Sequence, residues 1–141
     1  MAPISENLRI RDLMRRDVKT LRRNDELTIA DGVMRAERIR HLPVLDEDGA
    51  LAGILSQRDM FHSALVKALG YGTSAQAKML KMVVVKEAMT TEVVTTTPDT
   101  PVADAARLMV ERKIGCLPVV EGDALVGIVT ETDFVSLIAR G

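Results

Sequence analysis

The sequence predicts an α/β fold made of two β-α-β-β-α repeats that pack with pseudo-twofold symmetry. The first observation is an internal repeat, because a shift of 75 positions places Leu42-Pro43-Val44 on Leu117-Pro118-Val119. The second is a motif that occurs twice, once at Gly53–Asp59 and once at Gly127–Asp133. In each copy an apolar run of strand length leads to Ser or Thr, and Asp follows three residues later. Two copies of one folding unit explain both observations.

Each repeat begins with a short segment that ends at a methionine, Met14 or Met89. A short strand is predicted next, at 18–21 in the first repeat and at 93–96 in the second. The first helix of each repeat is then expected to be capped by Asp25 or by Thr100, since their side-chain oxygens can accept from free amides of the first turn. Apolar side chains at helical spacing predict one buried face on each of these helices: Leu27, Ala30, Val33 and Met34 in the first, and Val102, Ala105, Leu108 and Met109 in the second.

A hairpin follows each first helix, with strands that begin at 42 and 51 in repeat 1 and at 117 and 124 in repeat 2. Pro near the start of a strand is tolerated because it need not donate to the ladder. The second helix of each repeat begins after Ser56 or Thr130. A hydroxyl at the cap with a carboxylate three residues later is typical of a simple helix cap. The same groups also suit a ligand, because free amides attract phosphate and a carboxylate can accept both hydroxyls of a ribose.

The predicted domains are repeat 1 at 8–69, a linker at 70–83 and repeat 2 at 84–140. The run Gly70–Ser74 is expected to break the second helix of repeat 1. Residues 75–82 are expected to add one or two helical turns. The apolar run Met82–Val85 is expected to be buried in the core.

Composition excludes several function classes. The chain is 47% apolar and 28% charged, so it can bury a core. Its net charge of −1 and its three aromatic residues argue against nucleic-acid binding. No apolar stretch has the length of a membrane span. Cys116 is the only cysteine, which excludes an intrachain disulfide and fits a cytoplasmic protein.

The doubled and ordered set of motifs resembles a pair of cystathionine-β-synthase-type (CBS) domains over about residues 8 to 140. Leu-Pro-Val opens a strand in each repeat, and Gly-Ile-Val-Thr-x-x-Asp closes the second hairpin. The resemblance implies a stand-alone regulatory module with no attached catalytic or transport domain. It also implies that AMP, ADP, ATP or S-adenosylmethionine binds in clefts between the repeats and that binding signals to a partner protein, which the sequence does not identify.

The resemblance assigns roles to particular residues. Asp59 and Asp133 would hold ribose hydroxyls, and Ser56 and Thr130 would face phosphate. Further ligand-binding positions follow from the same resemblance: Val18, Thr20, Arg40, His41, Pro43, Arg58, Val93, Thr95, Pro118 and Thr132. Gly115 and Cys116 replace Arg40 and His41 in repeat 2. This change argues against phosphate binding at whichever site these two positions serve. Separately, Arg58 in repeat 1 and Glu131 in repeat 2 predict unequal sites, with tighter binding of phosphorylated nucleotides at the site of Ser56, Arg58 and Asp59.

No catalytic, metal or cofactor site is predicted, and an adenosine nucleotide is expected only as a regulatory ligand. His41 and Cys116 stand at equivalent positions, but two side chains do not fill a tetrahedral zinc site. A homodimer is expected from the resemblance and from the small core of each repeat. The main alternative is a ligand-free dimerisation or scaffold module. A small enzyme that acts on a nucleotide is a further alternative.

Overall fold

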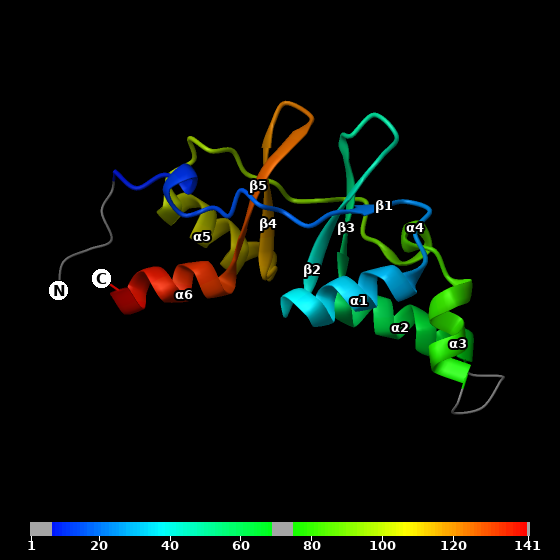
Figure 1. Ribbon diagram of the computed structural model, residues 1–141. Coiled ribbons are helices and arrows are strands. Elements are labelled where there is room, and N and C mark those ends of the chain that lie inside the picture. The colour runs from blue at the N-terminus through cyan, green and yellow to red at the C-terminus, as the bar shows by residue number, and fades with distance from the viewer. Residues whose placement is uncertain (1–6, 69–74, 141) are drawn as a thin grey trace. The chain divides into compact units, whose positions relative to one another are not determined.

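The computed structural model describes residues 7–68 and 75–140, which form two compact units (Figure 1). Unit 2 is Lys19–Val93, and unit 1 joins the chain up to Val18 to the chain from Val94 onward. The units therefore do not coincide with the sequence repeats. The segment that precedes the first strand of each repeat, residues 8–18 or 83–93, is called here the leading segment. The leading segment of each repeat belongs to the unit that holds the hairpin of the other repeat.

The described residues of unit 2 form a three-stranded sheet and four helices. Strand β1 (Leu21–Arg22) runs parallel to β2 (His41–Leu45), and β2 is antiparallel to β3 (Leu51–Ser56). The helices are α1 (Leu27–Glu37), α2 (Gln57–Ala68), α3 (Ala75–Met82) and α4 (Val85–Ala88). This order confirms the β-α-β-β-α pattern for repeat 1. The predicted helix break at Gly70–Ser74 falls largely in 69–74, outside the described residues.

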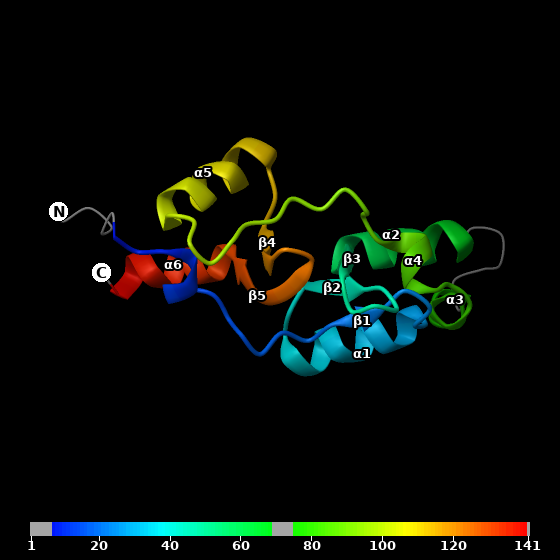
Figure 2. The same ribbon diagram turned by 90° about the horizontal axis from the view of Figure 1, so that it is seen from above.

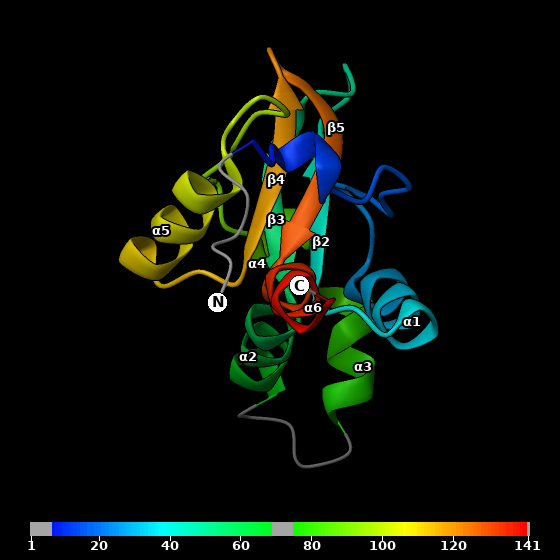
Figure 3. The ribbon, with the colours of Figure 1, turned by 90° about the vertical axis from the view of Figure 1, so that its left-hand side faces the viewer.

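Unit 1 repeats the hairpin and its two helices. Strands β4 (Cys116–Glu121) and β5 (Ala124–Thr130) pair antiparallel, with α5 (Val102–Arg112) before them and α6 (Glu131–Arg140) after them. Figure 3 shows α5 and α6 beside this hairpin. The predicted strand at 93–96 shrinks to a single bridge, in which Thr96 pairs in parallel with Val119. Pairing is limited to one residue because only Thr96 exchanges backbone hydrogen bonds with β4, at 2.9 and 3.0 Å.

The predicted apolar faces of α1 and α5 are confirmed. Leu27, Ala30 and Met34 are buried in one core, and Val102, Ala105 and Met109 are buried in the other. Val33 and Leu108 pack partly buried against the same cores. The helical period thus placed the core side chains correctly. None of the helices in the described part of the chain is long and apolar enough to cross a membrane.

The predicted caps of these helices are wrong. Helix α1 begins after Glu26 and α5 after Pro101, without a side-chain cap in either case. Asp25 instead accepts from the amide of Arg22 at 2.8 Å, and Thr100 accepts from the amide of Thr97 at 3.3 Å. The two side chains close the turn that precedes the helix, so their oxygens are not available to the first helical turn.

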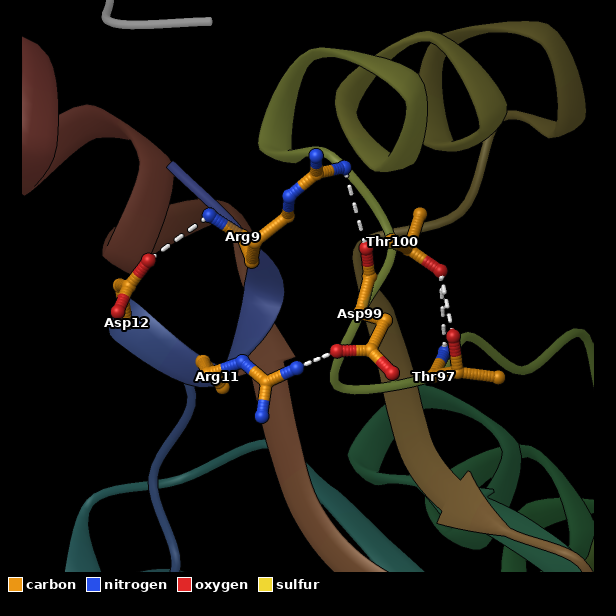
Figure 4. A network of polar contacts seen from close by, with 6 residues as sticks. All are labelled: Arg9, Arg11, Asp12, Thr97, Asp99 and Thr100. Atoms are coloured by element: carbon orange, nitrogen blue, oxygen red, sulfur yellow. Dashed lines mark hydrogen bonds and ion pairs between the residues drawn. The ribbon is translucent and has the colours of Figure 1, made fainter. Parts of the chain in front are cut away.

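The leading segment of repeat 1, residues 8–18, is fixed to unit 1 by polar contacts (Figure 4). It contains the short 3₁₀ helix η1 (Ile10–Asp12), which Asp12 closes by accepting from the amide of Arg9 at 2.9 Å. Arg9 donates to the carbonyl of Asp99 at 3.3 Å, and Arg11 forms an ion pair with the carboxylate of Asp99. These contacts join η1 to the turn before α5, as Figure 4 shows.

Each leading segment also forms a backbone bridge to a hairpin strand, to β5 in unit 1 and to β3 in unit 2. In both strands the bridged residue follows a glycine. Arg15 and Ile128 exchange backbone hydrogen bonds at 3.0 Å, and Thr90 and Ile54 do so at 2.9 and 3.0 Å. The neighbouring glycines are Gly127 and Gly53. A Cβ built on Gly53 would lie 2.7 Å from the carbonyl oxygen of Thr90, which leaves no room for any side chain. Glycine is therefore required because the leading segment crosses the strand at close range.

The predicted burial of the run Met82–Val85 holds for two of its four residues. Val83 and Val85 are fully buried in the core of unit 2, and the amide of Leu27 donates to the carbonyl of Val83 at 2.9 Å. Met82 is 70% exposed, so the burial does not extend to the whole run. Figure 2 shows α4 beside α2, and α3 next to the ends of α1 and α2. The predicted helical segment at 75–82 is confirmed as α3.

Candidate functional site

The Ser-x-x-Asp motif of repeat 1 lies where β3 ends and α2 begins. The amide of Asp59 donates to Ser56 Oγ at 3.0 Å, so the serine acts as the helix cap. The carboxylate of Asp59 is partly buried and has no hydrogen bond or ion pair to any residue that the structure describes. Arg58 next to it is exposed. This motif therefore offers an unused carboxylate, a hydroxyl hydrogen and a cation at the N-terminus of a twelve-residue helix.

The equivalent motif of repeat 2 has the opposite hydrogen-bond polarity. Asp133 is buried, and its Oδ2 accepts from the amide of Thr130 at 2.9 Å and from Thr130 Oγ1 at 3.3 Å. Its other oxygen, Oδ1, accepts from Arg15 Nε at 3.1 Å. In this motif the aspartate side chain accepts from the threonine amide. In repeat 1 the serine side chain accepts from the aspartate amide instead. Both oxygens of Asp133 are therefore engaged within the protein.

Arg15 was not among the residues predicted for the site. It comes from the leading segment, far from Asp133 in the sequence, and reaches it because Arg15 pairs with Ile128 of β5. The only signal in the sequence is the repeat, in which Arg15 aligns with Thr90. The alignment shows that arginine in one repeat corresponds to threonine in the other. It does not show that Arg15 lies beside Asp133.

The predicted residues of β2 gather at the same end of the hairpin as Ser56. His41 pairs with Ser56 across the ladder, and the carbonyl of Arg40 accepts from the amide of Gln57 at 2.8 Å. Pro43 is buried one step further along the strand. Repeat 2 places Cys116 opposite Thr130 in the same way, and Pro118 opposite Ile128. Thr132 is exposed on the first turn of α6. The structure thus brings Arg40 and His41 to the repeat 1 motif.

The remaining predicted residues lie where the chain passes from one unit to the other. Val18 belongs to unit 1 and Thr20 to unit 2, while Val93 belongs to unit 2 and Thr95 to unit 1. Their predicted position near a nucleotide base, and the clefts between the repeats, stay predictions. Thr95 does line a cavity of about 450 Å³ in unit 1, together with residues that lead into and form α5: Thr97, Thr100, Asp104, Arg107 and Glu111.

Cys116 is a buried free thiol at the start of β4. Burial raises the pKa of its thiol from 9.0 to about 12, and the nearby charge of Asp133 adds to the rise. The thiol is consequently neutral at ordinary pH and has little nucleophilic thiolate. This side chain is a small core residue and not a reactive group.

The raised pKa of Cys116 predicts a loss of stability at alkaline pH. The unfolded thiol ionises near 9.0 and the folded thiol near 12, so the contribution is complete below pH 9 and is lost as the pH rises toward 12. Between pH 8 and pH 10 the loss should reach about 1–1.5 kcal/mol. We expect Cys116→Val to flatten this part of the profile, measured by urea unfolding at pH 8, 9 and 10. A variant with the same alkaline slope as the wild type would contradict the assignment.

Comparison with known proteins identifies the family. A protein-family model described as "CBS domain" matches residues 10–65 and 85–140. The chain is 32% identical to the CBS domain-containing protein YhcV of Bacillus subtilis over 124 residues, which cover 88% of this chain and 81% of that protein. The first curated relatives that it matches are longer, and the chain spans 33% and 24% of their lengths.

Two solved structures extend this likeness to the fold. The CBS domain pair of protein MJ0100, in complex with 5′-methylthioadenosine and S-adenosyl-L-methionine, has a TM-score of 0.77 at 30% identity and covers 94% of this chain and 97% of that one. The protein CBSX2, in complex with AMP, has a TM-score of 0.75 at 26% identity and covers 94% and 96%. The chain therefore belongs to the CBS-domain family and carries a pair of CBS domains in the α/β fold of that family.

Proposed function

We propose that this chain binds an adenosine nucleotide and thereby regulates a partner protein, without catalysing a reaction. The observation that carries the proposal is the Asp59 carboxylate, which no described residue occupies at the N-terminus of α2. A carboxylate in this position can accept hydrogen bonds from both hydroxyls of a ribose. The Asp59 side chain is only partly buried, so its oxygens are open to a ligand.

The surroundings of Asp59 suit the rest of a nucleotide. The helix dipole at the start of α2 favours a phosphate, although the amides of Gln57 and Asp59 already donate to the Arg40 carbonyl and to Ser56 Oγ. Arg58 adds an exposed cation one residue before Asp59, and a guanidinium can hold two phosphate oxygens at once. His41 lies opposite Ser56 in the ladder, at this end of the hairpin. These groups together match an adenosine phosphate better than an uncharged ligand.

The relatives support the same ligand class. One solved CBS pair holds 5′-methylthioadenosine and S-adenosyl-L-methionine, and another holds AMP. All three molecules contain an adenosine with a ribose, although their charges differ. We therefore propose adenosine as the shared element, with the phosphate or sulfonium part decided by residues such as Arg58. Regulation would follow if the ligand binds one arrangement of the chain more tightly than another.

A panel of ligands tests the proposal. AMP, ADP, ATP and S-adenosylmethionine should be titrated while the melting temperature is recorded, with GMP and inorganic phosphate as controls. A ligand that binds only the folded state stabilises it by about 2.7 kcal/mol at a concentration of 100 times Kd. At least one adenosine ligand should raise the melting temperature more than both controls do. No rise with any adenosine ligand would contradict the proposal and favour the scaffold alternative.

The exposed apolar side chains of α6 support a homodimer. Val135 is 64% exposed and Ile138 is 66% exposed, and their spacing places them on one face of the helix. We expect a dimer at micromolar concentration, held by apolar helix faces, and a shift toward monomer in Ile138→Asp. Sedimentation velocity from 1 to 50 μM, about the range of weak to moderate dimers, measures both species. A wild-type chain that stays monomeric throughout would remove the dimer from the proposal.

A further inference from the structure

We propose that Arg15 is a specificity-determining residue that withholds Asp133 from ribose, so that the two motifs bind adenosine with different affinity. The inference rests on the proposed function, since it concerns the ribose acceptors of that function. It departs from the inequality expected from Arg58 and Glu131, because the deciding residue lies in the leading segment and acts on the carboxylate itself.

Asp133 is engaged on both oxygens. Oδ1 accepts from Arg15 Nε at 3.1 Å, and Oδ2 accepts from the amide and the hydroxyl of Thr130 at 2.9 and 3.3 Å. The exposed fraction of the Asp133 side chain is only 9%. An ionised carboxylate has about four acceptor positions in total. Three are used here, so a diol must displace Arg15 before Asp133 can accept both of its hydroxyls.

Asp59 provides the contrast within the same chain. Its amide is capped by Ser56, and no described residue donates to its carboxylate. The residue that aligns with Arg15 in the other repeat is Thr90. Both positions form the same backbone bridge to the hairpin, Arg15 with Ile128 and Thr90 with Ile54. The leading segment therefore approaches both hairpins through the same backbone bridge, and only in repeat 2 does the side chain at this position donate to the aspartate of the motif.

The contact is weak enough to act as a competitor and not as a permanent block. The Arg15 side chain is 57% exposed, so water and salt screen its charge. Ion pairs between exposed side chains contribute little to stability, and Arg15 is the exposed partner of this pair. Arg15 can therefore leave Asp133 when a ligand of sufficient affinity arrives. We expect the competition to lower the affinity of this motif for a neutral nucleoside by about threefold to tenfold.

Uncharged adenosine is the probe, because it separates the ribose from any attraction of phosphate to Arg15. The background is Asp59→Asn, which removes the carboxylate of the first motif. Adenosine should bind Asp59→Asn/Arg15→Thr about threefold to tenfold more tightly than Asp59→Asn by calorimetry. Arg16→Thr in the same background removes an equal charge from the next residue, which is exposed and makes no hydrogen bond or ion pair with Asp133, and should leave the affinity unchanged.

Two further measurements distinguish competition from a structural effect. The gain from Arg15→Thr should shrink as NaCl is raised from 50 to about 500 mM, because salt already weakens the exposed pair in the parent. In the wild-type background, Thr90→Arg should weaken adenosine binding at the Asp59 motif by a similar factor. A merely structural role for Arg15 would produce neither the salt dependence nor this reciprocal loss.

The outcomes separate this inference from the proposed function. If wild-type protein binds adenosine but Arg15→Thr gives no gain over Arg16→Thr, the inference fails and the proposed function stands. If Arg15→Thr weakens ATP binding and leaves adenosine unchanged, Arg15 is a phosphate ligand and the inference is overturned. If neither the wild type nor the Arg15→Thr variant binds any adenosine ligand, the inference and the proposed function both fail.

Discussion

Gly53→Ala should lower the free energy of unfolding by about 1–3 kcal/mol, as expected for a group forced into a closely packed site. The new Cβ would lie 2.7 Å from the carbonyl oxygen of Thr90 and 2.8 Å from Met89 Sδ. The sulfur can move, but the carbonyl is held by a pair of backbone hydrogen bonds between Thr90 and Ile54. Relief therefore requires the leading segment to separate from β3.

Gly32→Ala is the matched control for this change. Gly32 lies within α1, and a Cβ there would meet nothing within 4 Å. Replacing an exposed helical glycine by alanine should raise stability by about 0.5–1 kcal/mol. Urea unfolding of both variants gives the comparison. Two variants of equal stability would show that the leading segment does not lie against Gly53 as the structure has it.

Asp59→Asn should weaken the binding of AMP by about tenfold to a hundredfold. Asparagine keeps the size of the side chain but has one acceptor oxygen in place of two and lacks the charge, and hydrogen bonds to charged groups contribute about 1.5–3 kcal/mol. The loss should be similar for adenosine, AMP and ATP, because the ribose is common to all three. Calorimetric titration of each ligand measures it.

Arg58→Ala is the control that separates ribose from phosphate. Arg58 is exposed beside Asp59, so its loss should weaken ATP binding and leave adenosine binding nearly unchanged. An Asp59→Asn variant that binds AMP as well as the wild type does would remove Asp59 from the site. An Arg58→Ala variant that loses adenosine and ATP equally would show instead that the change disturbs the helix.

The helices and hairpins could be predicted well from the sequence because each of them occurs twice, once in each repeat. The helical period identified the buried faces of α1 and α5, and the motif located the starts of α2 and α6. Asp25 and Thr100 were misassigned because a side chain near a helix start can close the preceding turn as readily as it caps the helix. Local sequence does not distinguish these two uses.

The hydrogen bonds of the candidate site were less predictable. Ser56 and Thr130 occupy the same position in the motif. Yet Ser56 Oγ accepts from the amide of Asp59, whereas the amide of Thr130 donates to the carboxylate of Asp133. The repeat 2 arrangement includes Arg15, which comes from a distant segment that joins unit 1. Contacts of this kind depend on the tertiary pairing of the leading segment with β5. No periodicity or spacing around Asp133 reports that pairing.

The most direct test of the account compares AMP with 2′-deoxy-AMP on the wild-type chain and on Asp59→Asn. If the Asp59 carboxylate accepts the ribose hydroxyls, the wild type should bind AMP more tightly than 2′-deoxy-AMP, by a factor of about ten at least. This preference should fall strongly in Asp59→Asn, since the charged acceptor with two oxygens is replaced by a neutral amide with one acceptor oxygen. Equal affinity of the wild type for the two nucleotides, or a preference that Asp59→Asn retains in full, would contradict the central claim.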